Sequence, residues 1–186
     1  MLLGCHFILH SGIMSSMQRS VTSSCYDHVG IVCRIPPNSK HPSSLVVLEA
    51  TSDGVKKYPL RGRLMAWDLS DAQVVWRHLK IERTPEFQAQ LRDFVADMDG
   101  KQYGLNPINM IRRVSVQEKD SFFCSEIVAM ALKKVGALPD DKPSNAYLPV
   151  TFSASSKLQM KGNASLDQEV LLQFHKLEVG IRACAD

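Results

Sequence analysis

The sequence lacks any run of about 18 apolar residues, the length that a membrane-spanning helix requires. Hydrophobic residues make up 45% of its 186 positions, but they occur in short segments. We therefore expect a soluble protein. A chain of this length can bury one substantial core and is too short for two, so we predict a single domain over residues 1–186.

Paired cysteines are also lacking. The five cysteines lie at positions 5, 25, 33, 124 and 184, without any CxxC spacing. This pattern argues against a disulfide framework and indicates free thiols in a reducing compartment. Cys5, His6 and His10 carry side chains that bind zinc, but they lie at an expected flexible start and have no matching second pair. We predict no metal and no cofactor.

Charge of one sign is not concentrated anywhere. The 22 basic and 19 acidic residues are spread along the chain and give a net charge of +3. No nucleic-acid partner is therefore predicted. Residues 2–5, LLGC, match the end of a bacterial lipoprotein signal, but no basic region or apolar core precedes them. We expect a cytoplasmic protein.

Short β-branched segments predict strands. Residues 27–34 and 44–51 are separated by two proline-containing clusters that cannot continue a strand ladder, which is typical of neighbouring antiparallel strands. Residues 72–79 predict a third strand, which follows a polar stretch containing glycine and proline. Together with the helices below, this pattern indicates an α+β fold.

The first helix is predicted between Thr84 and Gly100. Thr84 is a typical N-cap, Pro85 suits the first helical position, and Gly100 ends the helix. One face carries an apolar stripe of Phe87, Leu91, Phe94, Val95 and Met98.

The second helix is predicted to begin near Cys124 and to end at Gly136. Asp120 or Ser121 can cap it, and lysines favour its C-terminal end. Its apolar stripe consists of Ile127, Val128, Ala131, Leu132 and Val135.

Cys124 lies in the first turn of this second helix, on the side of the stripe. Unpaired backbone N–H groups and the helix dipole lower the pKa of a thiol there, which favours a nucleophilic thiolate. The same N–H groups can stabilise an oxyanion. The alternative is that Cys124 only packs in the core, as most buried cysteines do.

A nucleophilic thiol needs a base and a group that orients the base. Among the six histidines, His28 and His78 lie on predicted strands and either can face the helix. Glu49 is the one acid in an otherwise apolar strand, where an unpaired carboxylate would be costly to bury. A histidine on the neighbouring strand would satisfy it, and exposure to solvent is the alternative.

Several segments together resemble one known family. They are YDHVGIV, VVLEAT with DGVKKYPL, GKQY, FFCSEIVAMAL and NAYLPVTF, within about residues 4–155. In this order they are similar to the circularly permuted NlpC-type papain-like hydrolases, the YiiX-like proteins, in which the cysteine helix follows the histidine strand. The resemblance implies a permuted papain-like fold, with an antiparallel sheet packed against helices.

The resemblance also implies roles for individual residues. It makes Cys124 the nucleophile, His28 the base and later the acid, and Glu49 the group that orients His28. Tyr26 and Ser125 are candidates for stabilising the oxyanion or contacting substrate. The implied reaction is hydrolysis of an amide or ester through a thioester, on a peptide, isopeptide or lipid-linked substrate.

Some features depart from the family pattern or lie outside it. The usual Gly-Asp start is absent, since Gly4 precedes Cys5. The related lecithin:retinol acyltransferase-like branch carries Asn-Cys-Glu-His, whereas this chain has Phe-Cys-Ser-Glu. Residues 161–186 form a C-terminal extension, in which a capping-box pattern and an apolar stripe predict an amphipathic helix at Ser165–Gln168, Val170, Leu171, Phe174, Leu177 and Ile181.

Two further interpretations are open. Residues 111–120 form either a solvated connection or a lid over Cys124. Four aromatic residues either line a substrate groove or pack in the core: Trp67, Trp76, Phe122 and Phe123. As alternatives to a cysteine hydrolase, we consider a non-catalytic module of the same fold that holds an amphiphilic ligand, and an acyltransferase.

Overall fold

A mixed sheet and helix architecture is formed by the residues that the computed structural model describes, 6–11, 26–70, 72–103 and 121–173. The strands are β1 (His6–Ser11), β2 (His28–Arg34), β3 (Leu45–Thr51), β4 (Gly54–Pro59), β5 (Gln73–Lys80), β6 (Gln102–Tyr103), β7 (Ser121–Phe122), β8 (Ser165–Leu166) and β9 (Val170–Leu171). The α-helices are α2 (Leu60–Leu69), α3 (Pro85–Met98) and α5 (Cys124–Lys134). Short 3₁₀ helices are η1 (Pro42–Ser44), η2 (Ser144–Ala146) and η3 (Pro149–Phe152).

The main sheet of this described part has seven strands in the order β4-β3-β2-β1-β5-β8, with β9 also paired to β5. All of its pairings are antiparallel. The register between β2 and β3 places Ile31 opposite Leu48, which confirms that these two predicted strands are neighbours. The predicted third strand is β5. The small β6-β7 sheet is parallel.

Strand β1 corrects our expectation of a flexible chain start. Its backbone pairs with β2 on one side and β5 on the other, so it is a central strand. His10 lies opposite His28 in one register and opposite Val74 in the other. Because both partners come later in the sequence, no local hairpin signal identifies this strand.

Helix α3 confirms its predicted cap and its apolar stripe. The Thr84 hydroxyl accepts a hydrogen bond from the Phe87 N–H at 3.2 Å, and Pro85 occupies the first turn. The five predicted stripe residues are all buried. This stripe anchors α3 to the sheet.

Helix α5 begins at Cys124, and its predicted cap is wrong. Its N-cap residue is Phe123, which makes no side-chain capping bond; instead the Glu126 carboxylate accepts the Phe123 N–H at 3.3 Å. Ser121 belongs to strand β7, and Asp120 lies outside the described residues. Pairing of β7 with β6 keeps the chain extended up to residue 122, so the helix starts after it.

The predicted C-terminal amphipathic helix is also wrong where the structure describes it. Residues 165–166 and 170–171 form β8 and β9, which pair with β5. The buried guanidinium of Arg77 donates to the carbonyls of Asp167 at 2.7 Å and Leu166 at 3.3 Å. These bonds hold the segment extended along the sheet. The stripe positions from Phe174 onward, and the predicted lid 111–120, lie outside the described residues.

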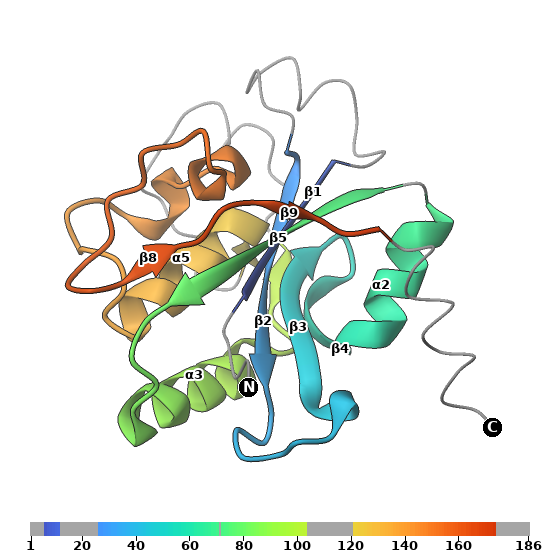
Figure 1. Cartoon of the computed structure of the whole chain (residues 1–186), viewed down its shortest axis with the longest axis horizontal. Coiled ribbons are helices and arrows are strands. Elements are labelled where there is room, and N and C mark those ends of the chain that lie inside the picture. Colours follow the sequence, from blue (N-terminus) through green and yellow to red (C-terminus); the bar gives the residue numbers. More distant parts are fainter. Residues whose placement is uncertain (1–5, 12–25, 71, 104–120, 174–186) are drawn as a thin grey trace.

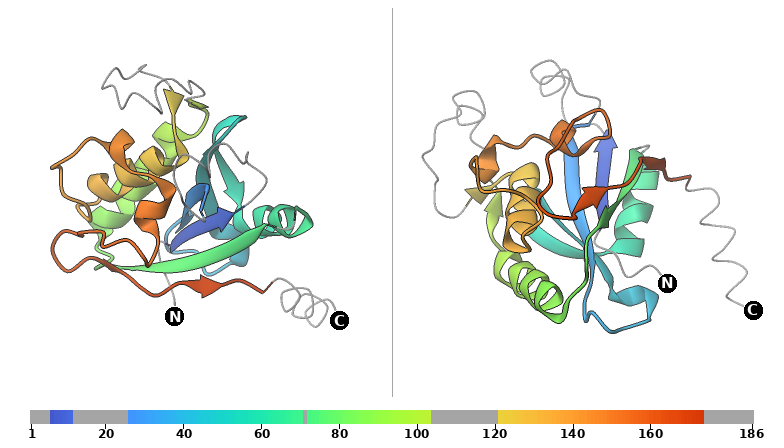
Figure 2. Two further views of the ribbon diagram at one scale, coloured as in Figure 1. Left: turned by 90° about the horizontal axis from the view of Figure 1, so that it is seen from above. Right: turned by 60° about the vertical axis from the view of Figure 1, so that its left-hand side comes forward.

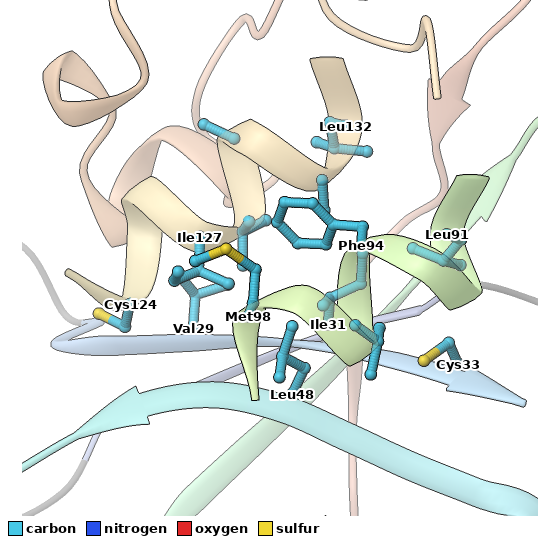
Figure 3. Packing of buried hydrophobic residues seen from close by; sticks show 14 of the residues in the cluster. Val29, Ile31, Cys33, Leu48, Leu91, Phe94, Met98, Cys124, Ile127 and Leu132 are labelled. Carbon is cyan, nitrogen blue, oxygen red and sulfur yellow. The ribbon is translucent and has the colours of Figure 1, made fainter. Parts of the chain in front are cut away.

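The sheet lies between two layers of helix. Helices α3 and α5 cover one face, and α2 lies on the other face (Figure 1, Figure 2). The larger core, on the α3 and α5 side, includes Ile31, Leu48, Phe94 and Ile127 (Figure 3). The smaller core, on the α2 side, consists of Val32, Val47, Leu60, Trp67, Ala72 and Val74.

The stretch between β3 and β5, expected only to be polar, folds into β4 and α2. Trp67 of α2 is 4% exposed and Phe122 is 7% exposed, so both pack in the cores. Trp76 packs against the smaller core while remaining partly exposed. Among the helices of residues 6–11, 26–70, 72–103 and 121–173, none has the length and hydropathy of a membrane span.

Candidate active site

Cys124 is the first residue of α5 and is buried in the larger core. Figure 3 shows it at the start of the helix, beside Val29 of β2. The backbone N–H groups of Val29 and Ser125 hydrogen-bond to its sulfur. Two fixed donors from different elements therefore face the thiol.

His28 opens strand β2 and is 8% exposed. Its Nε2 lies 2.7 Å from Oε2 of Glu49. Because Nε2 is bonded to Glu49, Nδ1 remains for the thiol of Cys124, with which His28 also hydrogen-bonds. His28 begins its strand and Cys124 begins its helix, so the two side chains meet at this end of the sheet.

Glu49 of β3 is completely buried. One carboxylate oxygen, Oε2, bonds His28, and the other, Oε1, forms an ion pair with Nε of Arg63 on helix α2. Sequence reasoning predicted the histidine partner and missed the arginine. Arg63 lies in a segment without a clear apolar stripe, so no pattern marked α2 as part of the site.

Gly30 lies where strands β2 and β3 approach each other closely, beside Glu49. The register that pairs Ile31 with Leu48 brings Gly30 next to Glu49. A Cβ on Gly30 would lie 2.9 Å from Val47 Cγ2 and 3.5 Å from Glu49 Cβ. The glycine of the His-Val-Gly motif is therefore required by close approach of the two strands.

We expect Gly30→Ala to lower the free energy of unfolding by about 1 to 3 kcal/mol, because the added methyl overlaps the buried Val47 side chain. Urea denaturation measures this change. Gly62→Ala on helix α2 is the matched control: a Cβ there meets nothing within 4 Å, and alanine is the better helix former. Equal stability of the two variants would contradict the packing argument.

The charges at the site favour a thiolate–imidazolium pair. Burial raises the pKa of the Cys124 thiol, but the charge and hydrogen bond of His28, with the two backbone N–H groups, lower it below its ordinary value. Burial lowers the pKa of His28, but Cys124 and then Glu49 outweigh burial and raise that pKa to about 10. At neutral pH the shared proton therefore belongs on the imidazole.

The pKa of Glu49 is lowered even though burial by itself would raise it. The hydrogen bond and charge of His28 lower it most, followed by the positive charge of Arg63 in the ion pair. Glu49 is thus an ionised carboxylate with a partner on each oxygen.

The other two predicted site residues have their hydroxyls bonded elsewhere. The Tyr26 hydroxyl donates to Glu169 Oε2 at 2.8 Å, and the Ser125 hydroxyl donates to the Tyr147 carbonyl at 2.7 Å. An oxyanion role for the Tyr26 hydroxyl would require that hydrogen bond to break. Ser125 reaches the site through its backbone N–H, not its side chain.

His78, the other strand histidine, lies on β5 near the charges of Arg83 and Asp167. The charged groups around the His78 imidazole are therefore different from those around the Cys124 thiol. Within the described ranges, no group of three or more His, Cys, Asp or Glu side chains is placed to hold a metal ion.

Comparison with protein families identifies the fold. Residues 7–172 match the sequence model of one protein family, the permuted papain-like amidase enzymes of the YaeF/YiiX, C92 family. The chain belongs to this family. The match includes the segment with β8 and β9, and it makes the protein an enzyme of the papain-like amidase type. The predicted family and fold class are confirmed.

A solved structure of the same fold is the metalloprotein yiiX from Escherichia coli O157:H7. It aligns with a TM-score of 0.52 and 19% sequence identity, over 91% of this chain and 96% of that chain. At this identity the similarity shows the permuted papain-like fold alone. No curated protein sequence matches the chain significantly.

Proposed function

We propose that this amidase-family protein hydrolyses amide bonds through a thioester on Cys124, with His28 as base and acid and Glu49 as the group that orients His28. The observation that carries the proposal is the continuous contact from the Cys124 thiol through the His28 ring to Glu49, with Nε2 and Oε2 2.7 Å apart. A buried thiol that served only packing would not need a histidine whose own orientation is fixed by a buried acid.

The first half of the reaction forms the thioester. The Cys124 thiolate attacks the acyl carbon, and the carbonyl π electrons move to oxygen to give a tetrahedral intermediate. The carbonyl then re-forms, the C–N bond breaks, and the His28 imidazolium gives its proton to the leaving amine. The products of this half are a free amine, an acyl-Cys124 thioester and a neutral His28.

The second half returns the enzyme to its starting state. Neutral His28 removes a proton from water as the water oxygen attacks the thioester carbon. The C–S bond breaks, Cys124 leaves as the thiolate, and the acid product departs. His28 keeps the proton, so the thiolate–imidazolium pair is restored.

The oxyanion of each tetrahedral intermediate needs fixed donors. The N–H of Cys124 lies in the first turn of α5, where helix geometry supplies no carbonyl four residues earlier in the helix. It is our candidate for the first donor, in line with the free N–H groups of such a turn. The same acyl carbon is present in peptides, isopeptides and lipid-linked amides, which together define the proposed substrate class.

Alkylation by iodoacetamide across a pH series tests the proposal. Because His28 lowers the pKa of its thiol, Cys124 should be alkylated at about pH 6, well below the free-cysteine pKa of about 8.5. Peptide mass spectrometry assigns the label to each of the five cysteines. Cys33, a buried free thiol of the same core, is the internal control. Slow and equal labelling of all thiols would instead support a binding module of the same fold.

A further inference from the structure

Each carboxylate oxygen of Glu49 contacts a different residue, and the proposed reaction uses only the contact with His28. Oε2 bonds His28 of β2, and Oε1 pairs with Nε of Arg63 of α2. Helix α2 lies on the opposite side of the sheet from α5, which carries the nucleophile (Figure 2). The site thus extends through the sheet, from Cys124 to a cation on the other face.

Arg63 is fixed in place by aromatic rings. Its guanidinium carbon lies 5.0 Å from the centroid of the Tyr58 ring and 5.2 Å from that of the Trp67 ring. Trp67 is itself buried in the smaller core. Cation–π contacts of this kind orient a planar guanidinium, and Arg keeps its charge at any pH that a protein survives. The side chain is 25% exposed, so its charge is only partly screened by water.

The reaction makes a second cation necessary. His28 is positively charged before the attack and neutral after it has given its proton to the leaving amine. In that neutral interval Glu49 would be a buried carboxylate without a cationic partner, and a buried unpaired charge is strongly disfavoured. Such a carboxylate would compete with neutral His28 for the proton that His28 must remove from water.

We propose that Arg63 is a positioning residue that keeps Glu49 ionised, with Oε2 directed at His28, in both protonation states of the histidine. The inference rests on the proposed function and adds a fourth member to the chain of contacts. Arg63 does not touch the thiol or the substrate and acts only through Glu49.

The groups that can influence the titration of this unit come from every element around it. His28 and Glu49 lie between charged or titratable residues of β4, α2 and α5, placed there by contact or by strand register: Lys56, Tyr58, Arg63 and Cys124. On β1, His10 is opposite His28 in backbone register. Lys56 lies opposite Glu49 in register but is exposed, so Arg63 is the cation that meets the carboxylate directly.

The test is the pH profile of Cys124 alkylation by iodoacetamide in the 186-residue chain carrying Arg63→Gln. Without the guanidinium charge, Glu49 takes up a proton more readily and stabilises the imidazolium less. A less stable imidazolium disfavours the thiolate that pairs with it, so we expect the acid limb to move to higher pH and the rate at about pH 6 to fall about tenfold.

Three variants separate charge from structure. Arg61→Gln removes the same charge from an exposed position of the same helix and should leave the profile unchanged. Arg63→Lys keeps the charge and should bring the profile back toward that of the unmodified protein. Arg63→Met keeps an unbranched chain against Trp67 and should reproduce the shift even if Arg63→Gln does not fold.

The outcomes distinguish this inference from the proposed function. Thermal unfolding is measured on every variant, and a lower Tm with an unchanged alkylation profile would overturn the positioning role. A shift as large in Arg63→Lys as in Arg63→Gln would overturn it too, because the charge would not matter. If iodoacetamide alkylates Cys124 of the unmodified protein only at pH values near the ordinary thiol pKa, the proposed function fails and the inference fails with it.

Discussion

Cys124→Ala should abolish acyl transfer while the protein remains folded. Removing the nucleophile of a unit that acts together lowers turnover by about 10⁴-fold or more. p-Nitrophenyl acetate, an activated ester, provides the measurement. The unmodified protein should release a burst of p-nitrophenolate and gain one acetyl group on Cys124, which mass spectrometry locates. The variant should show neither, because no thiolate remains to form the thioester.

Cys33→Ala is the matched control for this variant. Cys33 is a buried free thiol in the same core. It lies toward the opposite end of β2 from His28, and Figure 3 shows it well separated from Cys124. Its loss should leave the burst intact, and both alanine variants should unfold within about 1 kcal/mol of one another. An acetyl group found on another residue, with turnover undiminished in Cys124→Ala, would reject Cys124 as the nucleophile.

Features with a local signature could be predicted from the sequence. The β-branched runs gave strands β2, β3 and β5 close to their observed bounds. Thr84 and Pro85 located the start of α3, because a cap and a preset backbone angle act within one turn. The stripe from Phe87 to Met98 then identified the buried face.

Features that depend on distant partners could not be predicted in this way. Strand β1 is central because β5 pairs with it, and no sequence pattern within residues 6–11 predicts that pairing. The C-terminal segment has a helical pattern, yet it forms β8 and β9 because the edge of β5 and the buried Arg77 bind its backbone. Long-range pairing here overrides local propensity.

Among the residues of the candidate site, too, some have a local signature in the sequence and others depend on distant partners. Glu49 stands out as an acid in an apolar strand, so its need for a partner is visible in the sequence, and the structure places His28 on it. Arg63 is one of two arginines in the short helix α2, and no pattern in the sequence separates it from Arg61. What distinguishes Arg63 is its contact with Glu49, which only the folded chain reveals.

His28→Ala should reduce turnover nearly as much as Cys124→Ala and should also change the thiol itself. Without the imidazolium, burial is no longer outweighed and the pKa of Cys124 rises. Alkylation at about pH 6 should therefore fall steeply, and recover only as the pH passes the ordinary thiol value of about 8.5.

The double variant His28→Ala with Cys124→Ala should be no worse than Cys124→Ala alone, because the losses of residues that act as one unit do not add. His78→Ala is the matched control, since it removes a histidine from β5 of the same sheet that lies near Arg83 and Asp167 instead of the thiol. The decisive comparison is between the two histidines. A steep loss of low-pH alkylation in His78→Ala, with His28→Ala unaffected, would show that the imidazole which activates Cys124 comes from β5 and not from β2.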